Sequence, residues 1–209
     1  MIEVEIRGEL TKEEFDRLKK FMADKGEHVE SHEREMILLT DGYPGYDVDP
    51  LKRATDIRLR KTNDKCEIMV KHKVSANNNS RQEISLPLAV ADLTKGKEVM
   101  KALGCTTGVW MHRLKDIYRY HDIEWSLVRT PGEHYYYEAE QEADVADQAE
   151  EMYEKISEEA RALGLQVFTP EETRDYILPI AKETDARFYK AIKQKCDYWG
   201  RKTKWKYGR

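Results

Sequence analysis

Charged and apolar residues alternate along most strand-like segments of this chain, and this alternation restricts the fold more than any other feature. In the first segment, Ile2, Val4 and Ile6 alternate with two glutamates and an arginine. Successive side chains of a strand point to opposite faces, so one face of this strand is ionic and the other is apolar. A similar alternation is found at 56–61, 66–73, 81–88, 113–120 and 135–142.

The signs of these charges are segregated along the chain. The first and last of these segments carry glutamates on their ionic face, whereas the middle segments carry mainly arginine and lysine. A solvated sheet face is the ordinary explanation for one such strand. For all of them together it is weaker, because like charges at this density repel one another and require counter-charges. We therefore expect the apolar faces to pack outward and the ionic faces to line an interior that binds a polyanion and metal ions.

The number and order of the expected elements indicate an α+β protein. Thr11, with Glu14 three residues later, forms a capping box that opens an amphipathic helix ending near Gly26. Strands are expected at 2–7, 28–40, 55–61, 65–73, 80–88, 105–121, 123–130 and 134–142, and further helices at 92–103, at 145–163 and from 169 onward. The strands are mostly sequential, without strand–helix alternation, which predicts an antiparallel sheet. An eight-stranded antiparallel β-barrel, a tunnel with the helices packed outside, is the expected architecture.

Length and composition predict one domain with an appended tail. The chain has 209 residues, with 36 Lys and Arg against 40 Asp and Glu, and its formal net charge of −4 argues neither for nor against nucleic acid. The three cysteines form no CxxC pattern, and no apolar run suits a membrane span or a signal peptide. These features predict a cytoplasmic protein without a membrane partner. The expected domains are 1–180, the tunnel domain, and 181–209, a basic and aromatic helix or tail.

The tail is the one segment with a strong bias towards basic and aromatic residues. From Arg187 to Arg209 it has nine basic residues, one acidic residue and six aromatic residues. Such a segment can neutralise RNA and stack on its bases. The alternative, which we favour, is a segment whose aromatic side chains pack against the barrel. RNA remains a candidate partner, and the sequence does not indicate an oligomeric state.

The residue types in the expected interior point to phosphate chemistry. Carboxylates are hard oxygen ligands that suit Mg²⁺ or Mn²⁺. Arginine binds phosphate oxygens in a bidentate way, and lysine binds them as a point charge. Acidic and basic strands around one cavity therefore describe a site for a metal ion and a polyphosphate. The P-loop pattern GxxxxGK[ST], the common alternative for phosphate binding, is absent from the sequence.

Several short motifs occur in a fixed order along the chain. They are Glu3-Val4-Glu5-Ile6-Arg7, Arg58-Leu59-Arg60, Lys71, Arg81-Gln82-Glu83, the segment 112–118, Glu138-Ala139-Glu140 and Arg174-Asp175-Tyr176. Together they resemble the CYTH domain, or triphosphate tunnel metalloenzyme, family over about residues 1–180. Its hallmarks are an ExExK strand, a KxRxxY strand, a closing ExE and a Ser-Tyr at the final helix. An aspartate that the family often has on the strand before ExE is replaced here, and Glu124 and Asp122 are both candidates for its role.

The resemblance implies an eight-stranded tunnel that binds a triphosphate and hydrolyses or cyclises it with a divalent cation, Mg²⁺ or Mn²⁺. It implies metal ligands at Glu3, Glu5, Glu138 and Glu140. The implied catalytic residues are Glu5, Glu140 and Lys115, of which either glutamate could accept a proton from water. The implied substrate-binding residues are Arg7, Arg58, Arg60, Lys71, Lys73, Arg81, Arg113, Lys115 and Arg119. Tyr136 shares the parity of the tunnel face and is a candidate for contact with an organic group.

Four functions are compatible with this reading. The first is a metal-dependent triphosphatase acting on inorganic tripolyphosphate or on a nucleoside or other organic triphosphate. The second is a class IV adenylyl cyclase, which converts ATP to cyclic AMP and pyrophosphate. The third is an RNA 5′-triphosphatase, suggested by the strand 113–120 and the basic tail. The fourth is a protein that binds polyphosphate without turnover.

Overall fold

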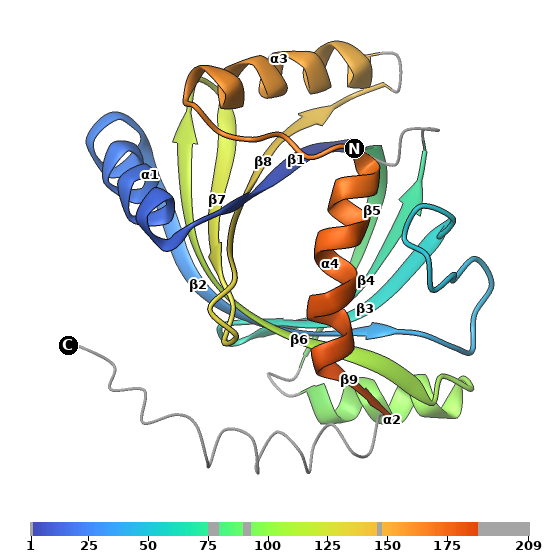
Figure 1. The fold of residues 1–209 in the computed structure, drawn as a ribbon. Coiled ribbons are helices and arrows are strands. Elements are labelled where there is room, and N and C mark those ends of the chain that lie inside the picture. The colour runs from blue at the N-terminus through green and yellow to red at the C-terminus, as the bar shows by residue number, and fades with distance from the viewer. Residues whose placement is uncertain (1, 75–79, 90–92, 146–147, 188–209) are drawn as a thin grey trace.

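Eight antiparallel strands form a closed ring in the computed structural model, which describes residues 2–74, 80–89, 93–145 and 148–187 (Figure 1). Around the ring the strands follow the order β2-β3-β4-β5-β1-β8-β7-β6, and β6 pairs with β2 to close it. Their bounds are β1 Ile2–Leu10, β2 Glu27–Leu39, β3 Thr55–Thr62, β4 Lys65–Lys73, β5 Ser80–Leu88, β6 Thr107–Tyr120, β7 Ile123–Arg129 and β8 Tyr135–Ala143. The predicted α+β class and the closed eight-stranded architecture are confirmed.

Tight turns join several of the neighbouring strands because their residues adopt backbone conformations that reverse the chain over a short distance. Asn63, between β3 and β4, has φ of 50°. His121 and Asp122, between β6 and β7, have φ of 51° and 60°. Positive φ at two successive residues is typical of the two-residue turns whose twist matches that of a hairpin. These turns fix the register that brings the ionic residues of adjacent strands to one face.

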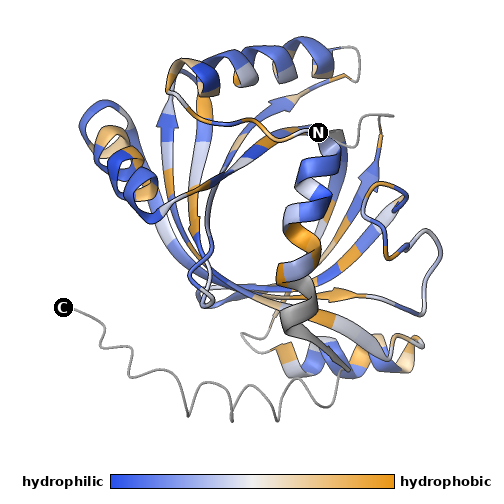
Figure 2. Cartoon of the chain, in the orientation of Figure 1, coloured by the Kyte–Doolittle hydropathy of each residue, from blue (hydrophilic) through white to orange (hydrophobic). Residues whose placement is uncertain are grey.

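The hydrophobic core lies outside the ring, between the strands and three helices. Helix α1 (Lys12–Lys25) packs on β1, β2, β6 and β8, α3 (Ala149–Ala162) packs on β1 and β8, and α2 (Leu93–Ala102) packs on β3 and β4. Val4, Met22, Trp125 and Ile156 are fully buried in the larger of two clusters, and each such side chain contributes about 1.5–3 kcal/mol to folding. Hydrophobic and hydrophilic residues alternate along the strands of the ring (Figure 2). The apolar faces of the strands therefore point outward, as predicted.

Helix α4 (Pro170–Thr184) lies across one end of the ring (Figure 1). Its first turn is capped by Thr169 and Glu172, each of which accepts a hydrogen bond from the backbone N–H of the other, at 3.2 and 2.8 Å. Tyr176 packs against the ring of Phe168, with 5.4 Å between the centroids, and its hydroxyl donates to the Tyr135 carbonyl at 3.4 Å. These contacts hold the start of α4 against β8.

The structure differs from the sequence prediction in two places. Helix α3 begins at Ala149, four residues later than expected. A short strand that was not predicted, β9 (Asp185–Arg187), pairs with Thr107–Val109 of β6. That edge of β6 is available because β6 is twice as long as β7, which pairs only with its second half. The predicted division into two domains stays a prediction; residue 180 lies within α4.

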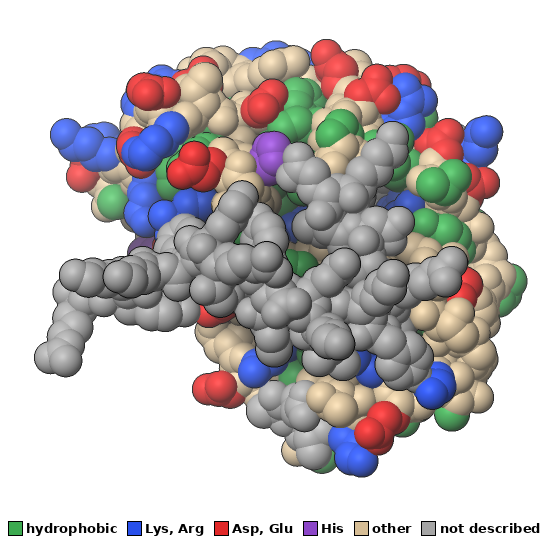
Figure 3. Space-filling view, turned by 60° about the horizontal axis from the view of Figure 1, so that its bottom comes forward, with side chains coloured by type: hydrophobic (Ala, Val, Ile, Leu, Met, Phe, Trp, Pro, Cys, Tyr) green, Lys and Arg blue, Asp and Glu red, His purple; other side chains and the backbone are tan. Residues whose placement is uncertain are grey.

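Most of the predicted tail lies beyond the part of the chain that the structure describes. The proposed roles of the tail concern residues 188–209, which lie outside the described residues, and they stay predictions. Among the described residues, no helix has the length and the apolar character required to cross a membrane. On the face shown in Figure 3, acidic and basic side chains are interspersed among the described residues.

Candidate functional site

The ring encloses a cavity of about 500 Å³ whose walls are ionic. All eight strands of the ring contribute side chains to it, and α4 and the loop between β2 and β3 cover part of one end. Its basic lining residues are Arg7, Arg34, Arg53, Arg58, Arg60, Lys71, Arg81, Arg113, Lys115 and Arg174, and its acidic ones are Glu3, Glu5, Asp56, Glu83, Glu124, Glu138, Glu140 and Glu142. The ionic faces of the strands therefore point into the cavity.

Three glutamates of adjacent strands converge in this cavity. Glu5 on β1 lies directly opposite Glu140 on β8 in the antiparallel register, and Glu3 is on the same face of β1. One carboxylate oxygen of each of Glu3, Glu5 and Glu140 lies within 4.8 Å of the others. Burial, followed by the charges of Glu3 and Glu5, raises the pKa of Glu140 to about 9. The surroundings therefore do not stabilise a third negative charge in the cluster without a cation.

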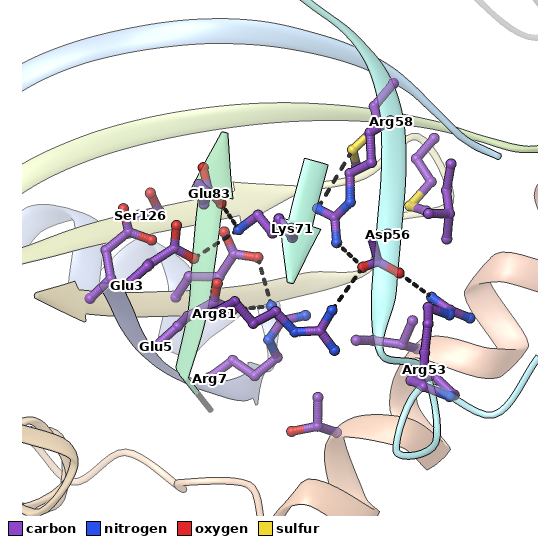
Figure 4. A pocket seen from close by; sticks show the side chains of 18 of the residues that line it. Glu3, Glu5, Arg7, Arg53, Asp56, Arg58, Lys71, Arg81, Glu83 and Ser126 are labelled. Carbon is purple, nitrogen blue, oxygen red and sulfur yellow. Dashed lines mark hydrogen bonds and ion pairs between the residues drawn. The ribbon is translucent and has the colours of Figure 1, made fainter. Parts of the chain in front are cut away.

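The donor set of this cluster fits a hard divalent cation. Carboxylate oxygens are the preferred protein ligands of Mg²⁺ and Mn²⁺, and a cation among them would offset their mutual repulsion. Lys71 Nζ donates to Glu3 at 2.8 Å and forms a second ion pair with Glu83 (Figure 4). Arg7 forms an ion pair with Glu5. Because Glu3 and Glu5 are each paired with a positively charged side chain, Glu140 is the member of the cluster most in need of a further cation.

Glu138 lies outside this cluster, although the sequence predicts it as a fourth metal ligand. Its carboxylate forms an ion pair with Lys115, and it also lies 3.4 Å from both Arg7 Nη2 and Arg113 Nη1. Burial alone would raise the pKa of Glu138, but these three cations outweigh burial and hold it well below its usual range. The structure therefore places Glu138 as the shared partner of Lys115 and two arginines.

A second carboxylate, Asp56 at the start of β3, is surrounded by arginines. Its Oδ2 accepts hydrogen bonds from Arg58 Nη2 at 2.7 Å and from Arg81 Nη1 at 3.1 Å, and its Oδ1 accepts one from Arg53 Nη1 at 3.3 Å (Figure 4). Burial disfavours its charged form, but the charges of Arg58, Arg81 and Arg53 lower the pKa of Asp56 to about 2. This carboxylate is ionised and fully compensated by its neighbours.

Arg34 on β2 is a lining residue that the sequence analysis did not identify. Its Nε donates to Thr62 Oγ1 at 3.1 Å, and it lies directly opposite Arg113 in the β2–β6 register. Burial, and then the charge of Arg60, lowers the pKa of Arg34 to about 10. A guanidinium held near other guanidiniums is stabilised by a bound anion.

Seven of the nine predicted substrate-binding residues line the cavity, and two do not. Lys73 is the last residue of β4, and its Nζ donates to the Leu51 carbonyl at 3.2 Å. Arg119 is exposed near the end of the long strand β6. Parity predicted these two side chains to be inside, and the residues opposite them in the register, Arg81 and Glu124, do line the cavity. Tyr136 also lies outside the lining, and its ring packs 5.6 Å from the guanidinium carbon of Arg113.

The remaining lining residues differ in how readily the sequence predicts their position in the cavity. Arg34 shares its face of β2 with Met36 and Leu38, whereas the opposite face carries Glu33 and Glu35, so the strand has no purely ionic face that would have identified it. Asp56, in contrast, shares the ionic face of β3 with Arg58 and was visible from the alternation. Arg53 and Arg174 come from a loop and from a helix that crosses the ring end, where no strand parity exists. Of the two candidates for the missing aspartate, Glu124 lines the cavity, whereas Asp122 is in the β6–β7 turn.

Comparison with known proteins agrees with this fold. The PH1819 protein of Pyrococcus horikoshii OT3 is 22% identical and superposes with a TM-score of 0.69 over 87% of this chain and 99% of its own. A proposed adenylate cyclase from Vibrio parahaemolyticus is 14% identical, with a TM-score of 0.61 over 79% of this chain and 90% of its own. HpAC1 from Hippeastrum, a proposed adenylyl cyclase with a dominant triphosphatase activity, is 18% identical, with a TM-score of 0.52 over 80% of this chain and 90% of its own.

No curated protein sequence matches the chain. The family model of the CYTH domain, in contrast, matches residues 1–173. This match includes all eight strands of the ring, the glutamate cluster and the first turn of α4. The structural neighbours and the family model therefore agree, and this chain belongs to the CYTH domain family.

Proposed function

We propose that this protein is a divalent-metal-dependent hydrolase of triphosphates that acts inside the closed ring. The observation that carries the proposal is the glutamate cluster, in which Glu3, Glu5 and Glu140 converge within a cavity whose other walls are basic. CYTH proteins are metal-dependent, and the oxygen donor set here fits Mg²⁺ or Mn²⁺. When bound, such an ion neutralises phosphate oxygens and lowers the pKa of water.

The basic residues bind and orient the phosphate chain in this proposal. Arg58, Arg60 and Arg81 offer planar guanidinium groups that suit phosphate oxygens. Arg34 and Arg113 add two more guanidiniums from β2 and β6. A closed cavity limits access of water and strengthens each of these charge interactions.

Lys115 is the residue best placed to stabilise charge during the transfer step. Its side chain is only 6% exposed, and Glu138 holds its ammonium group inside the cavity. A fixed cation that needs no reorganisation stabilises the charge developing on a transferred phosphoryl group. Glu5 and Glu140 are the candidates for accepting the proton of the attacking water. Lys115 therefore acts by electrostatics, and one of the two glutamates acts as base.

Cyclisation of ATP is the second candidate, since two of the similar structures belong to proposed adenylyl cyclases. Both reactions need a metal and the same basic walls, and they differ in the nucleophile. Water attacks in hydrolysis, whereas the ribose hydroxyl attacks in cyclisation. The products therefore distinguish the two functions.

The experiment is an incubation of the purified full-length protein with tripolyphosphate, ATP or a 5′-triphosphorylated RNA. Each substrate is tested with Mg²⁺, with Mn²⁺ and with EDTA, and the products are identified by chromatography. We expect orthophosphate from at least one substrate with metal, and none with EDTA. Cyclic AMP and pyrophosphate from ATP would establish the cyclase instead. Absence of any product with either metal would leave only a polyphosphate-binding protein.

A further inference from the structure

Two glutamates and a stacked aromatic pair meet on the outer face of β2 and β6, the two strands whose pairing closes the ring. The rings of Trp110 and His112 are nearly parallel, at 11°, with 6.0 Å between their centroids. Trp110 Nε1 donates to Glu35 Oε1 at 3.0 Å, and His112 Nε2 lies 2.5 Å from Glu33 Oε1. We call these four residues the seam surface.

The seam surface is outside the cavity because its residues alternate with lining residues. Arg34 of β2 and Arg113 of β6 line the cavity, so the residues next to them in each strand point outward. At one end, the Trp110 ring packs against the hydrophobic cluster that includes α2. At the other end, Lys19 of α1 donates to Asp116 of β6 at 2.6 Å. The seam surface is therefore a strip of sheet between α1 and α2.

The same pair of strands has a like-charge contact on its inner face. Arg34 and Arg113 lie directly opposite each other in the β2–β6 register. Like charges in this position oppose the pairing of two strands. Glu138 lies 3.4 Å from Arg113, whereas Arg34 donates to Thr62 of the neighbouring strand β3. A segment bound across the outer face would hold β2 and β6 together against the repulsion inside.

The chemistry of the seam surface suits a peptide with basic and aromatic residues. Carboxylates form charge-assisted hydrogen bonds with lysine and arginine, and the side chain of Glu33 is 47% exposed. The faces of tryptophan and histidine stack with other aromatic rings, and a guanidinium binds over an aromatic face. A peptide in which the two residue types are interleaved can use both kinds of contact at once.

This chain itself contains such a peptide close to the seam surface. Strand β9 pairs with Thr107–Val109 of β6, so the described chain ends at Arg187, beside the seam surface. Residues 188–209 contain eight basic and six aromatic residues against one acidic residue. The far end of the seam surface is about 17 Å along β6 from this point, and a segment of this length reaches about 70 Å when extended. The segment is long enough to turn back across the seam surface.

We propose that residues 188–209 bind the seam surface of their own chain. Basic side chains of the segment pair with Glu33 and Glu35, and aromatic side chains pack on the stack of Trp110 and His112. The bound segment straps β2 to β6 and stabilises the closed ring from outside. A tethered segment has an effective concentration in the millimolar range, which favours its own chain over a second copy. Because these contacts are outside the cavity, the inference does not depend on the proposed function.

The test measures hydrogen exchange of the full-length protein by mass spectrometry. In the wild type we expect slow exchange in peptides from residues 188–209. Glu33→Lys combined with Glu35→Lys turns two attractive contacts into repulsive ones, so exchange of these peptides should become about tenfold faster. High salt should accelerate their exchange in the wild type as well, because it screens the same contacts. The matched control is Glu151→Lys combined with Glu154→Lys, two exposed acids of α3, which should leave this exchange unchanged.

Circular dichroism shows whether the variant at Glu33 and Glu35 folds, and if it does not, the wild-type exchange and its salt dependence decide. Unprotected exchange of residues 188–209 in the wild type would overturn the inference. Protection that survives both substitutions, or that is lost equally in the α3 control, would also overturn it. Protection that increases with protein concentration, together with a dimer in sedimentation, would assign the segment to a second copy and contradict binding within one chain.

Discussion

The glutamate cluster and the arginine-bound Asp56 are two carboxylate environments within one cavity, and they have opposite electrostatic character. Glu140 faces two other glutamates, and its pKa is raised to about 9 by burial and by these neighbours. Asp56 is similarly enclosed, yet the charges of three arginines overcome the effect of burial and lower its pKa to about 2. Burial raises the pKa of both acids, and the sign of the neighbouring charges decides whether that rise is reinforced, as for Glu140, or reversed, as for Asp56.

This difference distinguishes carboxylates that need a bound cation, in the glutamate cluster, from a carboxylate that is already neutralised by side chains of the protein, Asp56. The charge of Asp56 is balanced by side chains of the same chain, so it needs nothing further. In the glutamate cluster Glu3 and Glu5 are paired with Lys71 and Arg7, but no cation is paired with Glu140, whose raised pKa disfavours its ionised form until a counter-ion arrives. Glu138 shows the same contrast within one strand, because it lies two residues from Glu140 on the same face but is bound by Lys115.

The largest effect is expected for Glu140→Gln. The change keeps the volume of the side chain and removes one oxygen ligand and one negative charge, so metal-dependent turnover should fall by roughly a hundredfold or more. Isothermal titration with Mn²⁺ should show a matching loss of metal affinity. The control is Glu142→Gln, on the same face of β8 but exposed and outside the cluster. Equal metal affinity in Glu140→Gln and the wild type would remove the cluster as the metal site.

Glu138→Gln tests whether its role differs from that of Glu140. The variant leaves Lys115, Arg7 and Arg113 without their shared partner, so turnover should fall by about 10- to 100-fold through misplaced cations. Metal affinity should change little, because Glu138 is outside the cluster. Mn²⁺ titration and kcat measured on the same preparation check this. A loss of metal affinity as large as that of Glu140→Gln would instead establish Glu138 as a metal ligand, as the family resemblance implies.

Strand parity accounts for most of the cavity lining, but not for all of it. The alternation in β1, β3 and β8 sufficed to predict a ring with an ionic interior, because a side chain's face follows from its position in a strand. Lys73 and Arg119 have the right parity, but the Lys73 ammonium group binds the Leu51 carbonyl and Arg119 is exposed, and parity carries no information about where the end of a long side chain binds. Arg53 acts from a loop through contacts that only the folded chain creates. The role of Glu138 depends on which cations surround it, and this too is set by tertiary structure.

Arg34→Met and Arg58→Met compare an uncompensated arginine with a compensated one. Both variants lose a donor to phosphate, so each should weaken tripolyphosphate binding by about 1.5–3 kcal/mol. Without ligand they should differ: Arg34→Met should raise the melting temperature, since a guanidinium crowded by other guanidiniums is removed. Arg58→Met should lower it, because Asp56 loses its closest partner. Calorimetry with and without tripolyphosphate measures both quantities, and a melting temperature that shifts in the same direction in both variants would contradict the comparison.

The smallest effect concerns the acid stability that Asp56 confers. The folded-state pKa of Asp56, about 2, is depressed below its ordinary value of 3.8. Its ionic contribution is therefore present above about pH 4 and is lost as the pH falls towards 2, and a depression of this size corresponds to about 2 kcal/mol of unfolding free energy. In Asp56→Asn this pH-dependent part is absent, so the difference in unfolding free energy between wild type and variant should shrink between pH 4 and pH 2. Urea unfolding at a series of pH values measures it, with Asp64→Asn, an exposed aspartate in the β3–β4 turn, as the control. A difference that stays constant over this range would mean that Asp56 is not held ionised by its arginines, and the contrast with the glutamate cluster would disappear.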